Sequence, residues 1–598
     1  MSDLRHALAL MAFIVALACV PLYSLNDFYL QILFTIGVNY MATSGLNVLV
    51  GYAGQKSLGH AGLFAVGAYT AALANVEWGV NPWAAFGLAG VFGAVFGLVI
   101  AMPSVRVSGP SLAMVTIGFG IVMEKIVTEW TDIFKGQAGV YGIGAPSFFG
   151  RSFTNLHWVW FVGALCILTH LLFRALLNGR FGRMFLAVQL AEPAAQSVGI
   201  SVARAKTLAF VISSVTCALA GALVAQQNQY FNSDFITFNL SIFFLVVVIF
   251  GGSGSIYGPL LGSIILTLLD AWLARWPALQ HFTYGALLLF SLYLMPNGIA
   301  GALAKLGGRT KPTNTEATGK GASALSLRTN ADAGAPLLVV SNLFKAYGGI
   351  VPVRDVSFSI GTGKVHALIG PNGAGKTTLL NLLSGHVMPD RGSIHLSGHE
   401  IAGCPAHEVA ALGVARTFQN LKLFGNLSAL DNVLVGAHLH VKTSFLSSLL
   451  GAPWSRRAER AARADALELL HELGLGSRAF DEAKSLPYGL QRRLEIARAL
   501  ASRPKLLLLD EPAAGLNPQE THELGDVIRR IQAAGITVLL IEHHMDLVMG
   551  ISDHVLVLDY GAKIAEGTPE SIRTNQSVIT AYLGAEDDHA LPEIVEAK

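Results

Sequence analysis

One stretch decides the fold of the second half of the chain: Val365-His-Ala-Leu-Ile-Gly-Pro-Asn-Gly-Ala-Gly-Lys-Thr-Thr378. A short, mostly apolar run predicts a buried strand, and the leucines from Leu379 onward predict a helix behind the glycine-rich loop. Glycines let backbone N–H groups curl around phosphates at the positive end of such a helix. Lys376 is expected to reach the β- and γ-phosphates, and Thr377 to bind Mg²⁺. The predicted ATP-binding residues here are Gly370, Pro371, Asn372, Gly373, Ala374, Gly375, Lys376, Thr377 and Thr378.

A second predicted strand, Leu506 to Leu509, ends in two acids. Asp510 is expected to hold the Mg²⁺ shell, and Glu511 to polarise the water that attacks the γ-phosphate. Two acids after a strand are commonly only a helix N-terminus, where negative charge is favourable. A third strand, however, is followed by Glu542 and His543, and this histidine can reach the same γ-phosphate. We therefore predict an ATP hydrolase whose catalytic residues are Glu511 and His543.

The composition divides the chain into two parts that need different solvents. The 598 residues are 53% hydrophobic and 13% charged, and only nine of the 39 Asp and Glu residues lie in residues 1–303. Lipid is the expected solvent of that part, and water of the rest. The net charge of +2 gives no reason to expect a nucleic-acid partner. The four cysteines lack metal-ligand spacing and are interpreted as small buried hydrophobes.

Apolar stretches predict about ten membrane-spanning helices, since each needs about twenty apolar residues. The first is interpreted as a retained span and not a secretory signal, because more spans follow. Glycines are frequent in 87–97 and 251–262, which indicates a tightly packed bundle or broken helices lining a pathway. The expected spans lie near 8–25, 29–50, 61–76, 82–103, 112–128, 157–177, 205–227, 238–252, 256–275 and 281–303.

Basic residues predict which loops face the cytoplasm. They follow the 157–177 span and the last span, and four spans lie between these two regions, so both face the same side. The loop from Glu129 to Asn155 then faces outward, where it either docks a partner or rests on the membrane surface. The basic residues are Arg174, Arg180, Arg183, Arg204, Lys305, Arg309 and Lys311.

The predicted fold is a polytopic all-α membrane domain of about ten helices, followed by an α/β P-loop ATPase domain. Residues 1–303 are assigned to the membrane domain and residues 336–598 to the ATPase domain. Residues 304–335 contain many Gly, Ala, Ser and Thr and no aromatic residue, so they are expected to form a flexible tether.

The motifs of residues 338–584 resemble an ABC-type nucleotide-binding domain. The resemblance implies that Tyr347 stacks on adenine, and that Gln419, in Ala-Arg-Thr-Phe-Gln-Asn, binds Mg²⁺ and senses the permease. Asp510 and Glu511 match the Walker B acids, and His543 the switch histidine. The segment that begins at Leu486 matches the signature, which contacts a nucleotide held by a partner ATPase. Its residues are Pro487, Tyr488, Gly489 and Leu490.

Some positions depart from that family pattern. Pro487 and Tyr488 stand where the signature usually has Ser and Gly, and Leu490 replaces a Gln. Asn517 stands where the D-loop usually has Asp. Proline cannot supply the serine hydroxyl, although Gly489 and the helix behind it can offer backbone N–H groups. The chain therefore keeps the residues for its own nucleotide, and the two sites of a complex need not be equivalent.

Both halves resemble the Liv-type family of branched-chain amino acid importers. On the ATPase side the similar segments begin at Ser485, Glu511 and Ile541, and on the permease side the similar segment is Gly45 to Leu63. The segment Ala191-Glu-Pro-Ala-Ala-Gln-Ser-Val-Gly199 resembles the cytoplasmic coupling loop of importers, which would sit beside Gln419. Its matching residues are Glu192, Ala194, Ala195 and Gly199. For Glu192 a plain helix-terminal charge is the alternative.

Four polar residues, Gln55, Lys56, Ser57 and His60, lie at or near membrane depth. Such groups are costly in lipid and face a cavity or another helix. Interhelical hydrogen bonding and substrate contact are both open for them.

The resemblance implies ATP-driven import of amino acids, branched-chain ones first, or of related small polar solutes across a bacterial inner membrane. Urea, amides or aromatic acids are alternative substrates. A half-exporter is disfavoured, because that class has six long helices and no such coupling loop. ATP and Mg²⁺ are the expected cofactors, and the ATPase domain is expected to be cytoplasmic. The expected partners are a second permease, a second ATPase, a periplasmic solute-binding protein and lipid, with a homodimer as the alternative to different subunits.

Overall fold

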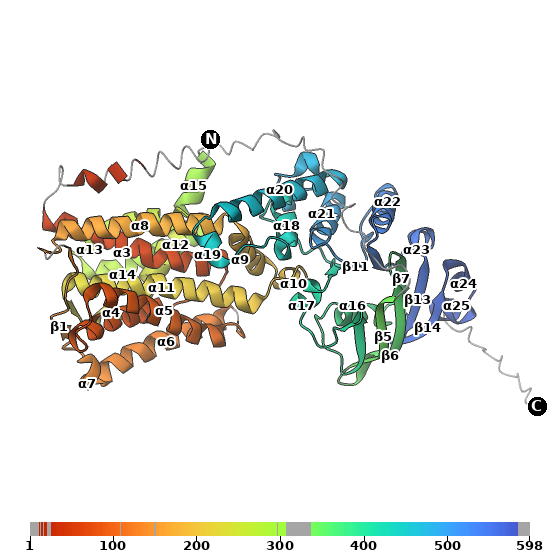
Figure 1. The fold of residues 1–598 in the computed structure, drawn as a ribbon, viewed down its shortest axis with the longest axis horizontal. Helices are drawn as coiled ribbons and strands as arrows, with labels where there is room; N and C mark the ends of the chain where they lie inside the picture. Colours follow the sequence, from red (N-terminus) through yellow and green to blue (C-terminus); the bar gives the residue numbers. More distant parts are fainter. Residues whose placement is uncertain are drawn as a thin grey trace, which may run out of the picture. The chain divides into compact units, whose positions relative to one another are not determined.

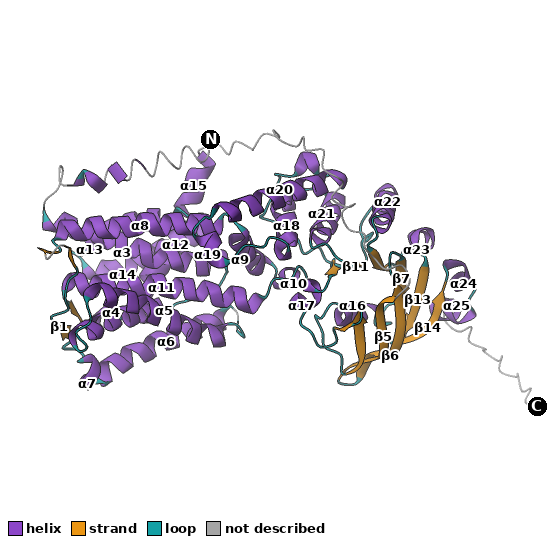
Figure 2. Ribbon diagram, in the orientation of Figure 1, coloured by secondary structure: helices purple, strands orange, loops and turns teal. Residues whose placement is uncertain are grey.

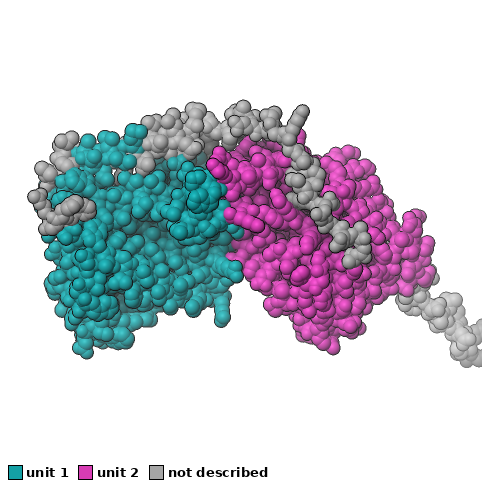
Figure 3. Space-filling model, viewed as in Figure 1, with its two compact units in different colours: residues 1–190, 202–311, 443–456 teal, residues 191–201, 312–442, 457–598 magenta. Residues whose placement is uncertain are grey.

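The computed structural model describes residues 11, 14–15, 17–20, 26–107, 109–148, 151–295, 297–306 and 336–583. Most of the predicted span 8–25 and of the predicted tether 304–335 therefore lies outside the described residues. The chain forms two compact units, coloured separately in Figure 3. The helical unit comprises Met1–Leu190, Val202–Lys311 and Thr443–Arg456, and the α/β unit comprises Ala191–Ser201, Pro312–Lys442 and Arg457–Lys598. Each unit thus includes a short segment from the other half of the sequence.

The helical unit is a bundle of apolar helices (Figures 1 and 2). Six of its described helical segments are long and apolar enough to cross a membrane, and shorter apolar helices accompany them. Its elements are α3 (Asp27–Asn47), the π-helical turn η1 (Val48–Tyr52), α4 (His60–Val76), α5 (Pro82–Ser104), α6 (Pro110–Glu129), α7 (Thr131–Phe134), α8 (Asn155–Leu177), α9 (Arg180–Leu190), α11 (Val202–Asn228), η2 (Ser233–Phe235), α12 (Phe238–Gly252), α13 (Gly258–Leu273), α14 (Pro277–Leu294), α15 (Gly298–Leu306) and α19 (Phe445–Leu449).

The last predicted span is wrong in one respect. A single helix was expected over 281–303, but α14 ends at Leu294 and α15 begins at Gly298. Gly298 has a φ of +59°, a conformation that interrupts a right-handed helix. The apolar stretch is therefore long enough for one span but is divided between two helices.

Glycines bring the central helices into backbone contact. A Cβ at Gly67 of α4 would lie 1.9 Å from the carbonyl oxygen of Ala218 in α11. A Cβ at Gly221 of α11 would lie 2.0 Å from the carbonyl oxygen of Phe64 in α4. No larger residue fits at such a crossing, where van der Waals packing replaces the hydrophobic effect. The glycine-rich stretch 87–97 lies within the unbroken helix α5, whereas 251–262 spans the turn between α12 and α13.

The helix bundle has two distinct ends (Figure 1). At one end the strand β1 (Val140–Tyr141) pairs antiparallel with β4 (Tyr230–Phe231), which directly follows α11. The hairpin of β2 (Ser147–Phe148) and β3 (Arg151–Ser152) belongs to the same connection between α7 and α8. At the opposite end lies α9, which follows the C-terminus of α8. The end with β1 and β4 is called the strand end below.

The α/β unit is built on a six-stranded sheet of order β10-β11-β12-β7-β13-β14. The first five strands are parallel and β14 is antiparallel to β13. Because carboxyl ends of parallel strands meet at one edge, the residues that follow β7, β11 and β12 converge there. The strands are β7 (Val365–Ile369), β10 (Val414–Arg416), β11 (Leu506–Asp510), β12 (Thr537–Ile541), β13 (His554–Asp559) and β14 (Ala562–Gly567).

A second, antiparallel sheet has the order β6-β5-β8-β9 and shares a buried core with the first sheet and α16. Its strands are β5 (Pro336–Tyr347), β6 (Ile350–Gly361), β8 (Arg391–Leu396) and β9 (His399–Glu400). The helices of this half of the chain, with α10 from the first half, are α10 (Glu192–Gln196), α16 (Lys376–Leu383), α17 (Ala406–Ala411), α18 (Ala429–Gly436), η4 (Ala437–Leu439), α20 (Pro453–Glu472), η5 (Gly476–Arg478), η6 (Ala483–Ser485), α21 (Tyr488–Ala501), α22 (Pro518–Ala533), α23 (Met545–Ile551), α24 (Pro569–Arg573) and α25 (Gln576–Leu583).

Candidate ATP site and coupling loop

The glycine-rich loop lies between β7 and α16, as the sequence predicts. Gly370 has a φ of +149°, and a Cβ there would lie 2.1 Å from the carbonyl oxygen of Leu558. Gly375 has a φ of +95°, and a Cβ there would lie 1.8 Å from the carbonyl oxygen of Pro352. Both positions therefore require glycine for steric and conformational reasons. The loop carries its backbone N–H groups to the N-terminus of α16, the usual geometry for binding phosphate.

Lys376 is the first residue of α16 and is buried. Its Nζ donates to the carbonyl oxygens of Gly370, at 2.7 Å, and Pro371, at 2.9 Å. Burial lowers the pKa of Lys376, and the carboxylates of Glu511 and Asp510 oppose that change. The ammonium thus lies inside the loop, while the next residue, Thr377, is exposed.

Asp510, the last residue of β11, is held by a buried arginine. The Nη2 of Arg416 donates to its Oδ2 at 3.1 Å, and both side chains are almost completely buried. Burial raises the pKa of Asp510, and the adjacent Arg416 guanidinium lowers it. Among the described residues, the other oxygen, Oδ1, is buried and has no hydrogen-bond partner. A buried carboxylate oxygen without a donor fits a hard cation such as Mg²⁺, which prefers oxygen ligands.

Glu511 lies between Gln419, which the family resemblance assigns to Mg²⁺, and His543, which the sequence assigns to the γ-phosphate. Its Oε2 accepts from the Nε2 of Gln419 at 2.9 Å, and its Oε1 lies 3.0 Å from the Nε2 of His543. The backbone of Glu511 has a φ of +45°, which a non-glycine residue adopts at some energetic cost. Its N–H donates to the carbonyl oxygen of Ile541 at the end of β12, which holds this conformation.

Glu542 was named in the sequence only as part of the switch segment, but its side chain has a clear positioning role. Its carboxylate is buried and accepts from the backbone N–H groups of Ala513 at 2.6 Å and His543 at 3.0 Å. A third, longer bond of 3.4 Å comes from the N–H of His544. One side chain therefore fixes the segments that follow both β11 and β12. Its place one residue before the predicted switch histidine was the available signal.

A buried charge cluster on α21, which sequence reasoning missed, supports the Gln419 segment. Arg492 donates through Nη1 to the carbonyl oxygen of Phe418 at 2.7 Å and through Nη2 to that of Gln419 at 2.6 Å. The same Nη2 lies 3.4 Å from the carbonyl oxygen of Glu511. Glu495, fully buried, pairs with Arg492 at 3.0 Å and with Arg498 at 3.6 Å. A helix of the signature region thus holds the backbone around the predicted catalytic carboxylate, Glu511.

Comparison with known proteins identifies this arrangement. Family models match residues 28–292, described as branched-chain amino acid transport system / permease component, and residues 353–514, described as ABC transporter. A third, the branched-chain amino acid ATP-binding cassette transporter, matches residues 562–588. The high-affinity branched-chain amino acid transport ATP-binding protein BraF of Pseudomonas aeruginosa is 50% identical over 250 residues, which are 42% of this chain and 98% of BraF. The chain belongs to the branched-chain amino acid family of ABC transporters.

Further relatives cover the same half of this ABC transporter chain. LivG of Escherichia coli, a protein of the same description, is 46% identical over 250 residues, 42% of this chain and 98% of LivG. A crystal structure of a nucleotide-free ATP-binding cassette from an ABC transporter is 31% identical, covers 42% of this chain and 100% of its own, and has a TM-score of 0.38. The permease match precedes the ATPase matches in one polypeptide, so the transporter chain carries both functions, and ATP hydrolysis is the reaction of its ATPase half.

The signature and D-loop of this ABC ATPase have local structural roles where they depart from the usual residues. Pro487 stands at the N-cap of α21, so the first turn of that helix offers backbone N–H groups and no capping side chain. Asn517 caps α22. Its Oδ1 accepts from the N–H of Glu520 at 2.8 Å, and its own N–H donates to the carboxylate of Glu520 at 3.1 Å. Asn caps a helix as well as Asp does. The role of Pro487, Tyr488, Gly489 and Leu490 toward a partner's nucleotide stays a prediction.

Tyr347, the predicted adenine-stacking residue, is the last residue of β5. Its ring is about half exposed, and the Nζ of Lys345 lies 5.4 Å from its centroid. A flat exposed ring at the last residue of β5 is available for stacking. Its contact with adenine stays a prediction.

The predicted coupling loop belongs to the α/β unit and forms α10. Ala194 and Ala195 are fully buried, and Gly199 has a φ of +85°. The carbonyl oxygen of Pro193 lies 3.4 Å from the Nε2 of His386. That imidazole meets the ring of Phe418 edge-on at 5.8 Å, one residue before Gln419. The loop is therefore connected, through the rings of His386 and Phe418, to the segment whose Gln419 binds Glu511.

Two of the four polar residues in the segment Gly45 to Leu63, Ser57 and His60, belong to a hydrogen-bond chain that reaches α11. Ser57 Oγ lies 3.1 Å from His60 Nδ1, and His60 Nε2 lies 2.7 Å from Ser213 Oγ on α11. Ser57, His60 and Ser213 are buried. Of the two alternatives left open by the sequence, interhelical bonding is what the structure shows for Ser57 and His60.

Proposed function

We propose that this chain is the combined permease and ATPase subunit of an importer of branched-chain amino acids. The observation that carries the proposal is the occurrence, in one polypeptide, of a branched-chain amino acid permease match and an ATP site with its phosphate loop, acids and histidine brought together. The C-terminal match to branched-chain amino acid ATP-binding cassettes supports the same substrate class.

ATP hydrolysis follows from the chemistry of the site. The loop N–H groups and Lys376 hold the phosphates. Glu511, fixed by Gln419 and His543, orients and polarises the attacking water. Asp510, Gln419 and Thr377 would hold Mg²⁺, which neutralises charge that develops on the phosphates. The pocket's own side chains thus supply positioning and a general base, which is most of what phosphoryl transfer requires.

The transport cycle requires partners. One chain supplies one permease and one ATPase, whereas the family uses two of each, so a second ATPase must complete the ATP site with its own signature segment. We favour different subunits over a homodimer because the signature and D-loop residues of this chain depart from the usual ones. The arginines Arg174, Arg180, Arg183 and Arg204 support a cytoplasmic location of the α8–α11 connection in a bacterial inner membrane. The strand end would then face a periplasmic solute-binding protein.

The test is solute accumulation in sealed vesicles that contain the complete complex with its binding protein. L-Leucine should accumulate only when ATP is present on the ATPase side, and excess L-isoleucine or L-valine should compete. Accumulation of urea, an amide or an aromatic acid in place of L-leucine would reassign the substrate. ATP-dependent export of solute would overturn the assignment as an importer.

A further inference from the structure

The helical unit contains a cavity of 530 Å³ with both polar and aromatic walls. Its volume falls within the range of about 300–1,000 Å³ that is usual for small-ligand pockets. Helices α3, α4, α11, α12, α13 and α14 contribute to it, together with the turn before α12. The polar lining residues are Gln31, Thr35, Asn39, Asn228, Asp234, Thr237, Asn239, Asp270, Gln280 and Tyr284.

The cavity lies at the strand end of the bundle. Its residues come from the first part of α3 and from the last residues of α11, which lead directly into β4. The remaining residues come from the turn before α12, the start of α12, the start of α14, Asp270 near the end of α13 and Phe64 in α4. Consecutive antiparallel helices place these segments at one end. The proposed orientation makes this the outer end, where solute arrives.

Two carboxylates, Asp234 and Asp270, line the cavity, and no lysine or arginine is found among its described lining residues. The Oδ1 of Asp270 accepts hydrogen bonds from Gln280 Nε2 and from Tyr284 Oη. These two donors fix the carboxylate, while its Oδ2 takes no hydrogen bond from the residues that the structure describes. Ionisable groups in a membrane domain are costly and generally serve a ligand or a pathway. An acidic cavity without a fixed cation favours a positively charged group.

Other parts of the same cavity are lined by aromatic rings and neutral amides. The rings of Phe64 and Phe244 approach at 6.0 Å, and the rings of Phe243 and Tyr284 at 5.5 Å, so one wall is aromatic. The buried Asn39 donates to Thr267 at 2.9 Å, and amide groups of Asn228 and Asn239 also line the space. Carboxylates can pair with an ammonium group, amides can donate to a carboxylate, and aromatic rings can cover an apolar side chain. The cavity therefore offers a group for each part of a small apolar amino acid.

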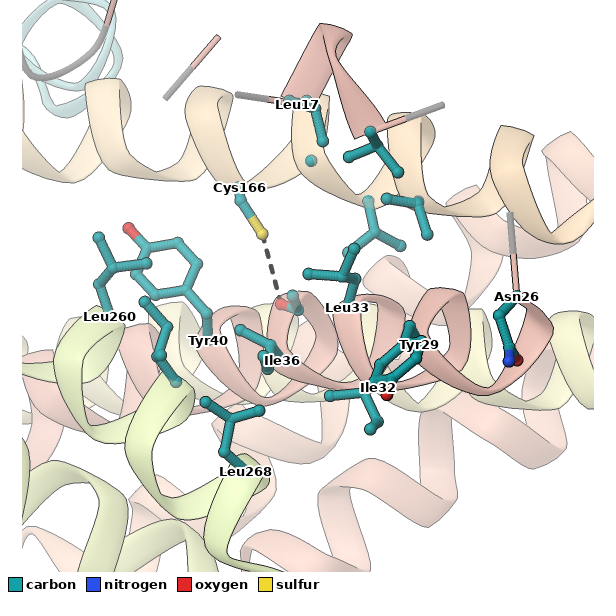
Figure 4. Close-up of a pocket in the computed structure, with 16 residues that line it drawn as sticks. Leu17, Asn26, Tyr29, Ile32, Leu33, Ile36, Tyr40, Cys166, Leu260 and Leu268 are labelled. Atoms are coloured by element: carbon teal, nitrogen blue, oxygen red, sulfur yellow. Dashed lines mark hydrogen bonds between the residues drawn. The ribbon is translucent and has the colours of Figure 1, made fainter. Parts of the chain in front are cut away.

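A larger cavity in the helical unit makes the contrast clear. It has a volume of 910 Å³ and lies between α3, α8 and α13, with Leu33, Ile36 and Leu268 among its apolar side chains (Figure 4). Cys166 donates to the carbonyl oxygen of Gly37 at 3.4 Å in its wall. No charged side chain lines it among the described residues. A zwitterion would lose its hydration there without compensation.

We infer that the 530 Å³ cavity is the solute-binding vestibule of the permease, which takes a zwitterionic amino acid with an apolar side chain. The ammonium group lies between Asp270 and Asp234, the amides of Asn228 and Asn239 donate to the carboxylate, and the phenylalanine wall covers the side chain. This assignment rests on the proposed function, and it names the residues that receive the solute after the binding protein releases it. Neutral urea, which has neither an ammonium group nor a carboxylate, is expected to bind this cavity more weakly than the amino acid.

The test measures equilibrium binding of radiolabelled L-leucine, at millimolar concentration, to the purified complex without its binding protein. Asp270→Asn and Asp234→Asn should each weaken binding by at least about ten-fold, because each removes a charge-assisted bond. The analogue 4-methylpentanoate, which lacks the ammonium group, should bind the unchanged complex at least about ten-fold more weakly than L-leucine. Asp132→Asn, in the exposed connection after α6, is the matched control and should bind L-leucine normally.

Asp270 also links α13 to α14, so its replacement could act through folding. Asp234 lies in the turn before α12 and accepts a hydrogen bond from Asn232 of the same turn at 2.8 Å. Because Asp234 links no two helices through this bond, weaker L-leucine binding by Asp234→Asn reports the loss of the carboxylate itself. Unchanged L-leucine binding by Asp234→Asn and Asp270→Asn, or equal binding of 4-methylpentanoate, would overturn the vestibule. So would an unchanged complex that binds no L-leucine. If vesicles with these variants still accumulate L-leucine normally, the vestibule is wrong while the importer assignment stands.

Discussion

Replacement of Glu511 by glutamine tests the catalytic site most directly. The amide has nearly the same shape as the carboxylate, but it cannot accept a proton from water. Glu511 now accepts from Gln419 on one oxygen and contacts His543 with the other, at 2.9 and 3.0 Å. Glutamine keeps one acceptor, and the neighbouring amide or imidazole can reorient to satisfy the other position.

The structural and catalytic costs of Glu511→Gln therefore differ in size. Loss of one hydrogen bond to a charged group costs about 1.5–3 kcal/mol at most in stability. Loss of a general base lowers the rate by about 10²- to 10⁴-fold, which corresponds to about 3–5 kcal/mol in the activation barrier. ATP binding should change little, because the loop and Lys376 are unaffected.

The assay measures phosphate release and nucleotide binding on the same purified complex, with the second ATPase subunit catalytically silenced so that only this site is observed. We expect at least about a hundred-fold slower hydrolysis with ATP still bound. Glu566→Gln, which removes the partner of Lys563 on β14, is the matched control and should hydrolyse ATP normally. Hydrolysis by Glu511→Gln within a few-fold of the unchanged chain would refute the catalytic role.

Three further predictions concern stability, pH and coupling. Asp510→Asn should destabilise the ATPase half by about 3 kcal/mol in thermal unfolding, because it removes the direct ion-pair partner of the buried Arg416. Burial and the neighbouring His554 lower the pKa of His366 from 6.5 to about 4. The folded state therefore favours the neutral imidazole, and the stability that goes with this form is present above pH 6.5 and is lost as the pH falls toward 4. The free energy of unfolding should fall by about 2 kcal/mol between pH 7 and pH 5 from this residue, and less in His366→Gln. Glu192→Arg should uncouple, so that vesicles hydrolyse ATP while solute uptake falls.

Each of these predictions has its own contradicting outcome. Asp526→Asn removes an exposed partner of His522 and should leave the unfolding temperature unchanged; an equal effect from both aspartate variants would disprove the buried-pair argument. His399→Gln on β9 is the control for the pH series, and identical acid sensitivity in His366→Gln and the unchanged chain would exclude His366 as the cause. Normal uptake by Glu192→Arg would refute the coupling-loop interpretation.

The elements that the sequence predicts well are those whose cause is local. The loop at Gly370 to Gly375 follows from glycines that take positive φ angles between a strand and a helix. Glu511 and His543 meet because parallel strands end at one edge of a sheet. These relations depend on neighbouring residues or on a general rule of topology, so a pattern in the sequence is sufficient to find them.

The relations that were missed depend on distant partners. Arg416 and Arg492 carry no local mark that distinguishes a buried arginine from an exposed one, and their partners are many residues away. The break before Gly298 did have a signal, the turn-forming Pro-Asn-Gly at 296–298, which the count of apolar residues concealed. The exchange of 191–201 and 443–456 between the two units depends on tertiary contacts alone, and the predicted domain boundaries stay a prediction.

Arg492 has a consequence for how two ATP sites influence one another. It belongs to the helix that begins at the signature segment, which the family resemblance directs toward a partner's nucleotide, yet it binds the carbonyl groups of Gln419 and Glu511 in its own site. If that helix moves when a partner's nucleotide binds at the signature segment, we expect the predicted water-positioning carboxylate of Glu511 to move with it. We therefore expect the two sites of a complex to bind ATP cooperatively, with a Hill coefficient that depends on the contacts of Arg492.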